Sequence, residues 1–162
     1  MKKNQKGFSL IELLIVVVII GIIAAIAIPN LLASRRSANE GSAISALRTL
    51  HGAEMTYAST YGAGNYADTL AKLGTPGLID SVLASGTKAG YVFTSSAVDA
   101  TATAPATFFV GNTPTTSTGV TATGTRKFGI ATEGVIYFDS TAPGTAFTAA
   151  TLTASPAQPL AN

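Results

Sequence analysis

A single carboxylate in a long apolar stretch is the group in this sequence that most clearly indicates a chemical role. Glu12 lies four residues after Phe8, and the chain from Leu13 to Ala33 carries no charged side chain. A charged side chain in such a run costs about 2.5–3.5 kcal/mol at the centre of a bilayer, so the residue marks a functional site. A cation that pairs with the carboxylate would offset its loss of hydration. Glu12 is therefore a candidate for an ion pair in apolar surroundings.

The other ionisable residues form no pattern that is typical of catalysis or of metal binding. His51 is the only histidine, there is no cysteine, and we expect His51 to be a surface or interface residue of a helix. The acids beyond residue 60 match neither a calcium loop nor a pair of catalytic carboxylates. The sequence therefore predicts no enzyme, no bound metal and no cofactor. The scattered acids are Asp68, Asp80, Asp99, Glu133 and Asp139.

Aromatic and basic residues suggest a second kind of chemistry, the binding of nucleic acid. Tyrosine rings can stack on bases, and the pair Arg126-Lys127 could contact phosphate. Packing between a helix and a sheet explains the tyrosines better, and solvation explains the basic pair better. These residues alone neither establish nor exclude a nucleic-acid partner. The tyrosines in question are Tyr57, Tyr61, Tyr66 and Tyr91.

Residues 6–12, with the sequence KGFSLIE, resemble the processing and methylation site of type IV prepilins and of their relatives, the pseudopilins. The resemblance is specific over 6–14 and loose as far as residue 60. It implies that a prepilin peptidase cleaves after Gly7 and N-methylates Phe8. It also implies that Glu12 pairs with the N-terminal amine of a neighbouring subunit during assembly. The implied partners are this peptidase, an inner-membrane assembly machinery with its ATPases, the membrane before assembly, and other copies of the chain.

The function that this resemblance implies is that of the major structural subunit of a type IV pilus. The subunit would polymerise through its N-terminal helix, with motility, adhesion or DNA uptake as downstream uses. It would lie in the inner membrane as a prepilin with a cytoplasmic N-terminus and then in a surface filament. The alternative is a pseudopilin of a type II secretion system. Major pseudopilins commonly carry calcium near the C-terminus, and because residues 140–162 hold no Asp or Glu, the pilin is favoured.

A secretory signal peptide is the competing explanation of the N-terminus. Three lysines, an apolar run and Ala25-Ile26-Ala27 are also typical of such a signal. The mature chain would then begin near Ile28 and form a soluble secreted binding module. The length of the apolar run and the charge of Glu12 oppose this interpretation, because a secretory apolar region has 7–15 residues.

The net charge depends strongly on the leader. The whole chain carries +2, with ten basic and eight acidic side chains. Without Lys2, Lys3 and Lys6, seven basic side chains remain against eight acidic ones, a net charge of −1. The basic balance therefore argues little for nucleic acid. Lysines before an apolar run instead favour a cytoplasmic N-terminus.

The pattern of apolar residues predicts an α+β fold. A long N-terminal helix, with an apolar transmembrane half and an amphipathic half, packs against a small antiparallel β-sheet. Pro29 predicts a kink or local melting near 25–29, because proline removes a helical hydrogen bond. The expected organisation is a leader 1–7, an apolar helix 8–33 and an extracellular globular domain 34–162, the last divided into helix 34–61, connecting region 62–89, sheet 90–139 and irregular tail 140–162.

Finer elements follow from turn residues and from β-branched runs. Glu133-Gly134 predicts a two-residue hairpin turn. The loop 112–124 is expected to be exposed, and the tail to contain a short strand over 146–152. We further expect short helices at 66–73 and 78–83, and strands at 91–94, 107–110, 125–132 and 135–139.

Overall fold

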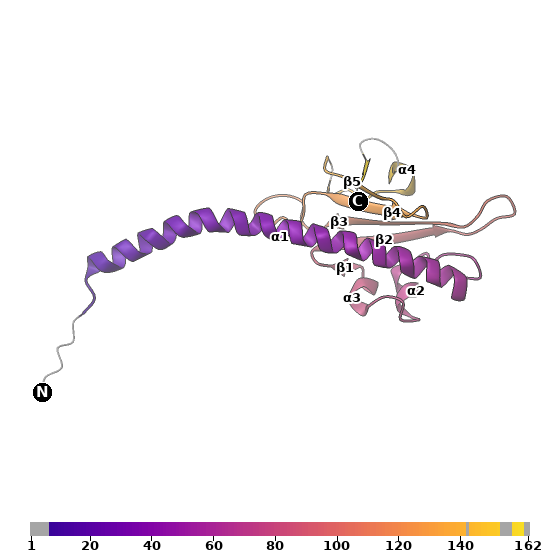
Figure 1. The fold of residues 1–162 in the computed structure, drawn as a ribbon, viewed down its shortest axis with the longest axis horizontal. Helices are drawn as coiled ribbons and strands as arrows, with labels where there is room; N and C mark the ends of the chain where they lie inside the picture. The colour runs from indigo at the N-terminus through magenta and orange to yellow at the C-terminus, as the bar shows by residue number, and fades with distance from the viewer. Residues whose placement is uncertain (1–6, 142, 153–156, 161–162) are drawn as a thin grey trace, which may run out of the picture. The chain divides into compact units, whose positions relative to one another are not determined.

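The computed structural model describes residues 7–141, 143–152 and 157–160. A helix, α1 (Leu10–Thr60), begins the fold, as Figure 1 shows. The chain divides into two compact units, of which the first ends at Ser34 and the second begins at Arg35. The sequence predicted this helix to within two residues at each end.

Glycines end α1 where the sequence indicated. The amide of Gly62 donates to the carbonyl of Tyr57, and the amide of Gly64 donates to that of Ala58. Ala63 and Gly64 have φ of 49° and 93°, in the left-handed region that glycine adopts without strain. These bonds satisfy carbonyls that the helix end would leave unpaired.

Pro29 lies inside α1, and the helix continues through it. The local melting that we expected near 25–29 is therefore absent from this structure, whereas the kink stays a prediction. Proline donates no amide hydrogen bond. The side-chain amide of Asn30 donates to the carbonyl of Ile26 at 3.2 Å, which adds a hydrogen bond in the turn that contains the proline.

The second unit contains one antiparallel sheet with the strand order β1-β2-β3-β4-β5-β6. Each strand pairs with its neighbours in the sequence, so the sheet is a meander (Figure 1). Together with α1, this sheet confirms the predicted α+β class. The strands are β1 (Thr87–Lys88), β2 (Tyr91–Val98), β3 (Thr107–Pro114), β4 (Lys127–Ala131), β5 (Ile136–Asp139) and β6 (Gln158–Pro159).

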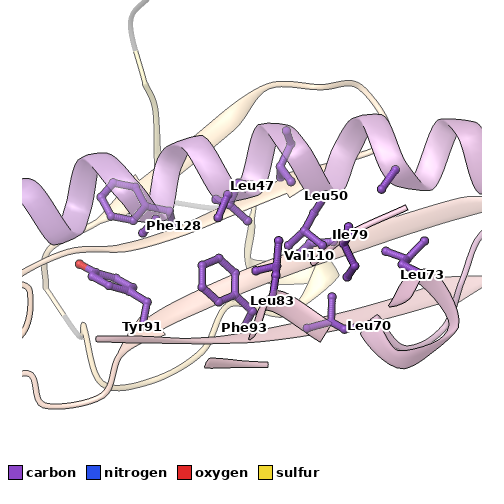
Figure 2. Packing of buried hydrophobic residues seen from close by; sticks show 14 of the residues in the cluster. Leu47, Leu50, Leu70, Leu73, Ile79, Leu83, Tyr91, Phe93, Val110 and Phe128 are labelled. Carbon is purple, nitrogen blue, oxygen red and sulfur yellow. The ribbon is translucent and has the colours of Figure 1, made fainter. Parts of the chain in front are cut away.

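The main hydrophobic core lies between the second half of α1 and one face of the sheet. Leu47 and Leu50 are fully buried, at the helical spacing that one face of a helix requires. Figure 2 shows them pointing toward Val110 and Phe128 of the sheet. Two short helices, α2 (Leu70–Gly74) and α3 (Ser81–Ala84), and the link between them also pack against this core. They contribute these buried residues: Leu70, Leu73, Ile79 and Leu83.

A smaller cluster covers the opposite face of the sheet. Phe109 lies there because side chains alternate along β3, and it packs with Phe147 and Leu152. Gly111 and Gly129 are register partners beneath this cluster. A Cβ at Gly111 would lie 2.8 Å from the Phe109 ring, and one at Gly129 would lie 2.5 Å from a methyl carbon of Leu152. A side chain at either position would displace a packed apolar side chain of this cluster.

Two local predictions were wrong. The β4–β5 turn is longer than two residues, because Ile130 and Ile136 are the last paired residues and Gly134, with φ of 77°, follows the turn proper. The tail segment expected to be a strand contains a helix, α4 (Ala149–Leu152). Its start is capped, since the amide of Thr151 donates to the Thr148 hydroxyl at 3.2 Å.

The predicted borders of the sheet and of its long loop also need correction. Strands β1 and β6 lie outside the predicted range 90–139, and two-residue edge strands are too short to show a pattern in sequence. The loop predicted over 112–124 is only partly exposed. Asn112 is buried, because its side chain accepts the amide hydrogen of Phe128 and donates to the carbonyl of Ala43.

Candidate processing and assembly site

The start of α1 is built by Ser9 and Glu12. The amide of Ser9 donates to Oε2 of Glu12 at 3.0 Å, and the carbonyl of Ser9 accepts from the amide of Leu13 at 3.3 Å. This is the reach-back half of a capping box, in which the third helical residue satisfies the amide of the N-cap residue. A carboxylate in the first turn is also favoured by the helix dipole. Glu12 thus has a local partner in the uncleaved chain.

The residues around the expected cleavage point are accessible. Gly7 and Phe8 precede the helix, and Phe8 is 89% exposed. A Cβ placed on Gly7 would meet no atom within 4 Å. The fold itself therefore does not require glycine at this position, so any requirement for a small residue would come from an enzyme that binds the segment.

The segment after this start leaves its apolar side chains uncovered. Every large apolar side chain from Leu10 to Leu31 is exposed within this unit. Among the described residues, α1 is the one helix long and apolar enough to cross a membrane by length and composition, with a mean hydropathy of 3.2 over its best window. Side chains of this kind are stable in lipid or against other apolar surfaces, not in water.

The structure separates the four candidate tyrosines into two pairs. Tyr91 is buried and donates its hydroxyl to the carbonyl of Arg126, and Tyr66 packs on Phe108 with ring centroids 4.8 Å apart. Tyr57 and Tyr61 instead lie at the end of α1, near the surface. The four tyrosines therefore do not form one exposed surface for stacking on bases.

His51 is partly buried at the interface between α1 and the sheet, the second of the two expected positions. Its Nε2 lies 3.4 Å from the carbonyl oxygen of Thr132, and its ring lies 5.5 Å from that of Phe108. Among the described residues, no three His, Cys, Asp or Glu side chains come together in a way that could hold a metal ion. His51 therefore has a packing role against the sheet.

The two basic residues predicted to be solvated are both engaged in ion pairs. Arg126 contacts Glu40 of α1 through Nε and Nη2, at 2.8 and 2.7 Å. Glu40 also accepts from the amide and hydroxyl of Thr125. Burial alone would raise the pKa of Glu40, but these hydrogen bonds outweigh it and lower the pKa. This contact ties the segment before β4 to the long helix.

Lys127 forms the second pair, with Asp139 on the neighbouring strand. The Nζ–Oδ2 distance is 3.2 Å, and the side chains are only 8% and 4% exposed. The ammonium also lies 4.6 Å from the centre of the Phe147 ring. Asp139 accepts from the amide and hydroxyl of Thr141, and although burial opposes them, these bonds and Lys127 lower its pKa.

Replacing Lys127 by methionine is expected to destabilise the second unit by about 3 kcal/mol, because breaking a buried pair leaves an uncompensated charge. Urea unfolding followed by circular dichroism would measure this loss. Lys72→Met is the matched control, since its pair with Asp68 is more than half exposed and has little effect on stability. Equal stability of Lys127→Met and the parent chain would contradict a structural role for the pair.

Glu54 is the most deeply buried of three carboxylates whose burial sequence reasoning missed, the others being Glu40 and Asp139. It is 0% exposed, and its oxygens accept from the amide of Ala67 at 2.8 Å and the hydroxyl of Ser95 at 3.2 Å. Burial raises its pKa to about 7; the two hydrogen bonds oppose this shift, and nearby Asp68 adds to it. Its burial could have been predicted from its spacing, because Glu54 lies on the same face of the helix as Leu47 and Leu50.

An apolar N-terminal helix with a capped start, and an antiparallel sheet over the second half of that helix, define a pilin-like α+β protein. A family model, the prokaryotic N-terminal methylation motif, matches residues 2–28. The N-terminal part of this chain therefore carries the signature of type IV pilins and their relatives, as the sequence predicted.

Curated relatives match short segments of the chain. Over 38 residues the chain is 66% identical to a type IV wide pilus major component of Thermus thermophilus. The aligned segment covers 24% of this chain and 29% of the relative. A type IV major pilin protein of Myxococcus xanthus is 45% identical over 56 residues, 35% of this chain and 26% of the relative. A type II secretion system core protein G of Aeromonas hydrophila is 38% identical over 52 residues, 32% and 36% of the two chains.

Each match covers only a small part of the relative's own length. The matched segments span between 26% and 36% of the three relatives. No solved structure gives a significant match to this chain. The sheet and its connections are therefore described from this structure alone.

Proposed function

We propose that this chain is the major structural subunit of a type IV pilus, which polymerises through its N-terminal helix. The uncovered apolar side chains of α1 carry this proposal. Burying each large side chain contributes about 1.5–3 kcal/mol relative to water. Lipid satisfies this requirement before assembly, and the same segments of other copies satisfy it in the filament.

The N-terminal site supports a defined order of events. While residues 1–7 are attached, Phe8 has no free amine, and the carboxylate of Glu12 bonds the amide of Ser9 within its own chain. Cleavage after Gly7 creates an amine on Phe8, and methylation modifies it. Glu12 of a neighbouring copy then pairs with this amine inside the apolar core of the filament, where neither charge is stable alone. Cleavage thus licenses assembly.

A pseudopilin of a type II secretion system is the second candidate. The likeness to core protein G of Aeromonas hydrophila favours it. The higher identity to a type IV wide pilus major component, 66% over 38 residues, favours the pilus. Both candidates share the same processing and differ in where the assembled subunit is found.

Mass spectrometry of the N-terminus distinguishes these candidates. Material sheared from cells that express the chain with its native assembly machinery is compared with the membrane fraction. Methylated Phe8 in abundant extracellular fibres is the expected result. Methylated Phe8 confined to the membrane fraction would favour the pseudopilin, and an N-terminus at Ile28 would overturn both in favour of a secreted binding module.

Gly7→Leu is expected to block removal of the leader. No atom of the chain lies near a Cβ at this position, so the substitution leaves the fold intact. A bulky side chain would instead clash in the peptidase site. The mass of the membrane-bound chain, with and without residues 1–7, measures the effect. Gly21→Leu is the matched control, because this glycine also has open space around it and lies away from the cleavage point. Complete processing of Gly7→Leu would contradict the assigned cleavage point.

A further inference from the structure

An open pocket of about 460 Å³ lies at the C-terminal end of α1. Tyr57 and Tyr61 form one wall, since residues four apart lie on the same face of a helix. Their ring centroids are 6.1 Å apart and the rings are tilted by 32°. The pocket is completed by Lys72, Thr75 and Pro76. Its volume is within the range of about 300–1,000 Å³ that small-molecule sites occupy.

The two tyrosines of this wall differ from the other two in their hydroxyl groups, although Tyr57, like Tyr66, is partly buried against the main core. Tyr66 and Tyr91 use their hydroxyls within the protein, on Met55 and on the carbonyl of Arg126. Within the described ranges, the hydroxyls of Tyr57 and Tyr61 form no such bond, and Tyr61 is 56% exposed. The pocket therefore has an aromatic wall whose polar ends remain available to a ligand.

The rim of the pocket offers both donors and acceptors. Lys72 Nζ lies 2.9 Å from Oδ2 of Asp68, and both side chains are more than half exposed. One carboxylate leaves two of the three ammonium hydrogens available. The hydroxyl of Thr75 donates to the carbonyl of Ala71 and can still accept. A ligand with several hydroxyl groups would find partners of both kinds here.

The local charge selects against a polyanion. The hydrogen bond with Asp68 raises the pKa of Lys72, and the charge of Asp99 also acts in this direction. One cation therefore stands against two carboxylates in this region. Aromatic rings also stack on nucleic-acid bases, but the phosphates of nucleic acid need a basic surface. A ring with apolar faces, hydroxyl edges and no charge fits this combination better.

We propose that this pocket binds a neutral saccharide ring, which lies against Tyr57 and Tyr61 and directs hydroxyls to the Lys72–Asp68 pair. The proposal is independent of filament assembly, because all of the pocket residues belong to the second unit. It assigns a role to the exposed ring of Tyr61 and to the hydroxyl groups of both tyrosines, which neither the core nor the processing site uses.

Tyrosine fluorescence provides the test, because the chain contains five tyrosines and no tryptophan. The full-length chain, in a detergent without a sugar headgroup, is titrated with chitobiose and with maltose. A saturable change with at least one sugar, with a dissociation constant of about 1–10 mM, is expected. Tyr61→Ala should weaken binding about tenfold, as the loss of one aromatic contact implies, and Tyr61→Phe should retain most of it. Val120→Ala, at a position that is 73% exposed in another loop, is the control that should bind as the parent does.

Several results would overturn the proposal. One is the absence of a saturable change with both sugars up to about 50 mM, a concentration well above the weakest expected dissociation constant. Another is the same affinity for sugar in Tyr61→Ala as in the parent. A third is tighter binding of a thymidine oligonucleotide than of both sugars, which would indicate nucleic acid as the ligand. If Tyr61→Ala fails to fold, Lys72→Ala provides a second test, because it removes the ammonium at the rim of the pocket. Unchanged binding of sugar by Lys72→Ala would also contradict the proposed site.

Discussion

Glu12→Gln is expected to abolish filament assembly although it preserves the hydrogen bond at the start of α1. The amide oxygen of glutamine can accept from the amide of Ser9, as Oε2 of Glu12 does at 3.0 Å. Glutamine carries no charge, so it cannot neutralise the amine of Phe8 on a neighbouring copy. An unpaired ammonium in an apolar core costs several kcal/mol. The yield of sheared fibres is expected to fall at least tenfold, while processing and membrane insertion continue.

This substitution separates two roles of the same carboxylate. If Glu12 acts only as a helix cap, Glu12→Gln assembles normally, whereas Glu12→Ala loses the cap and about 1 kcal/mol of helix stability. If Glu12 acts through its charge, both variants fail. Ser9→Ala is the control, because it changes the same turn without removing the carboxylate. Normal fibres from Glu12→Gln would disprove the ion-pair role.

Glu54→Gln is expected to raise the free energy of unfolding at pH 8 by about 3 kcal/mol, the equivalent of a shift of more than two pKa units. Burial raises the pKa of Glu54 from 4.5 to about 7. Between these values the folded chain binds more protons than the unfolded chain, so stability falls as the pH rises through this window. Glutamine remains neutral at all these pH values. Its amide can still accept from the amide of Ala67 and donate to the hydroxyl of Ser95.

Urea unfolding of residues 34–162 at pH 4.5, 6 and 8 measures this effect, since both hydrophobic clusters lie in this part of the chain. The parent should lose stability between pH 4.5 and 7, and Glu54→Gln should not. Glu133→Gln is the matched control, because Glu133 is exposed and should behave as the parent does. A parent that gains stability between pH 5 and 8 would contradict the buried, neutral form of Glu54.

Two other carboxylates determine how the stability of residues 34–162 depends on pH at acidic values. Hydrogen bonds and ion pairs lower the pKa values of Glu40 and Asp139 below their ordinary values of 4.5 and 3.8. Their contribution to stability is present above these values and is lost as the pH falls through the folded pKa values. With Glu54 acting in the opposite direction above pH 4.5, the stability of residues 34–162 should be greatest near pH 5.

The N-terminal half of this protein could be predicted from sequence because its determinants are local. The apolar run requires a helix in lipid, since every backbone group must be satisfied within the segment. Gly64, with φ of 93°, follows the end of that helix in a conformation that glycine adopts without strain. The methylation-type motif lies within seven residues, 6–12, so no folding is needed to bring its parts together. The α+β class followed similarly from a change of period along the chain.

The contacts that decide the second unit connect residues far apart in sequence, and these could not be predicted. Glu40 bonds Arg126, 86 positions later, and Glu54 bonds Ser95, 41 positions later. The helical spacing of Glu54 indicated a buried position, but nothing in the sequence indicated the partner of either carboxylate. The sequence by itself determined the long helix, its methylation-type motif and the α+β class. The tertiary structure decided which charges are buried and which tyrosines remain exposed, because burial depends on which surfaces meet.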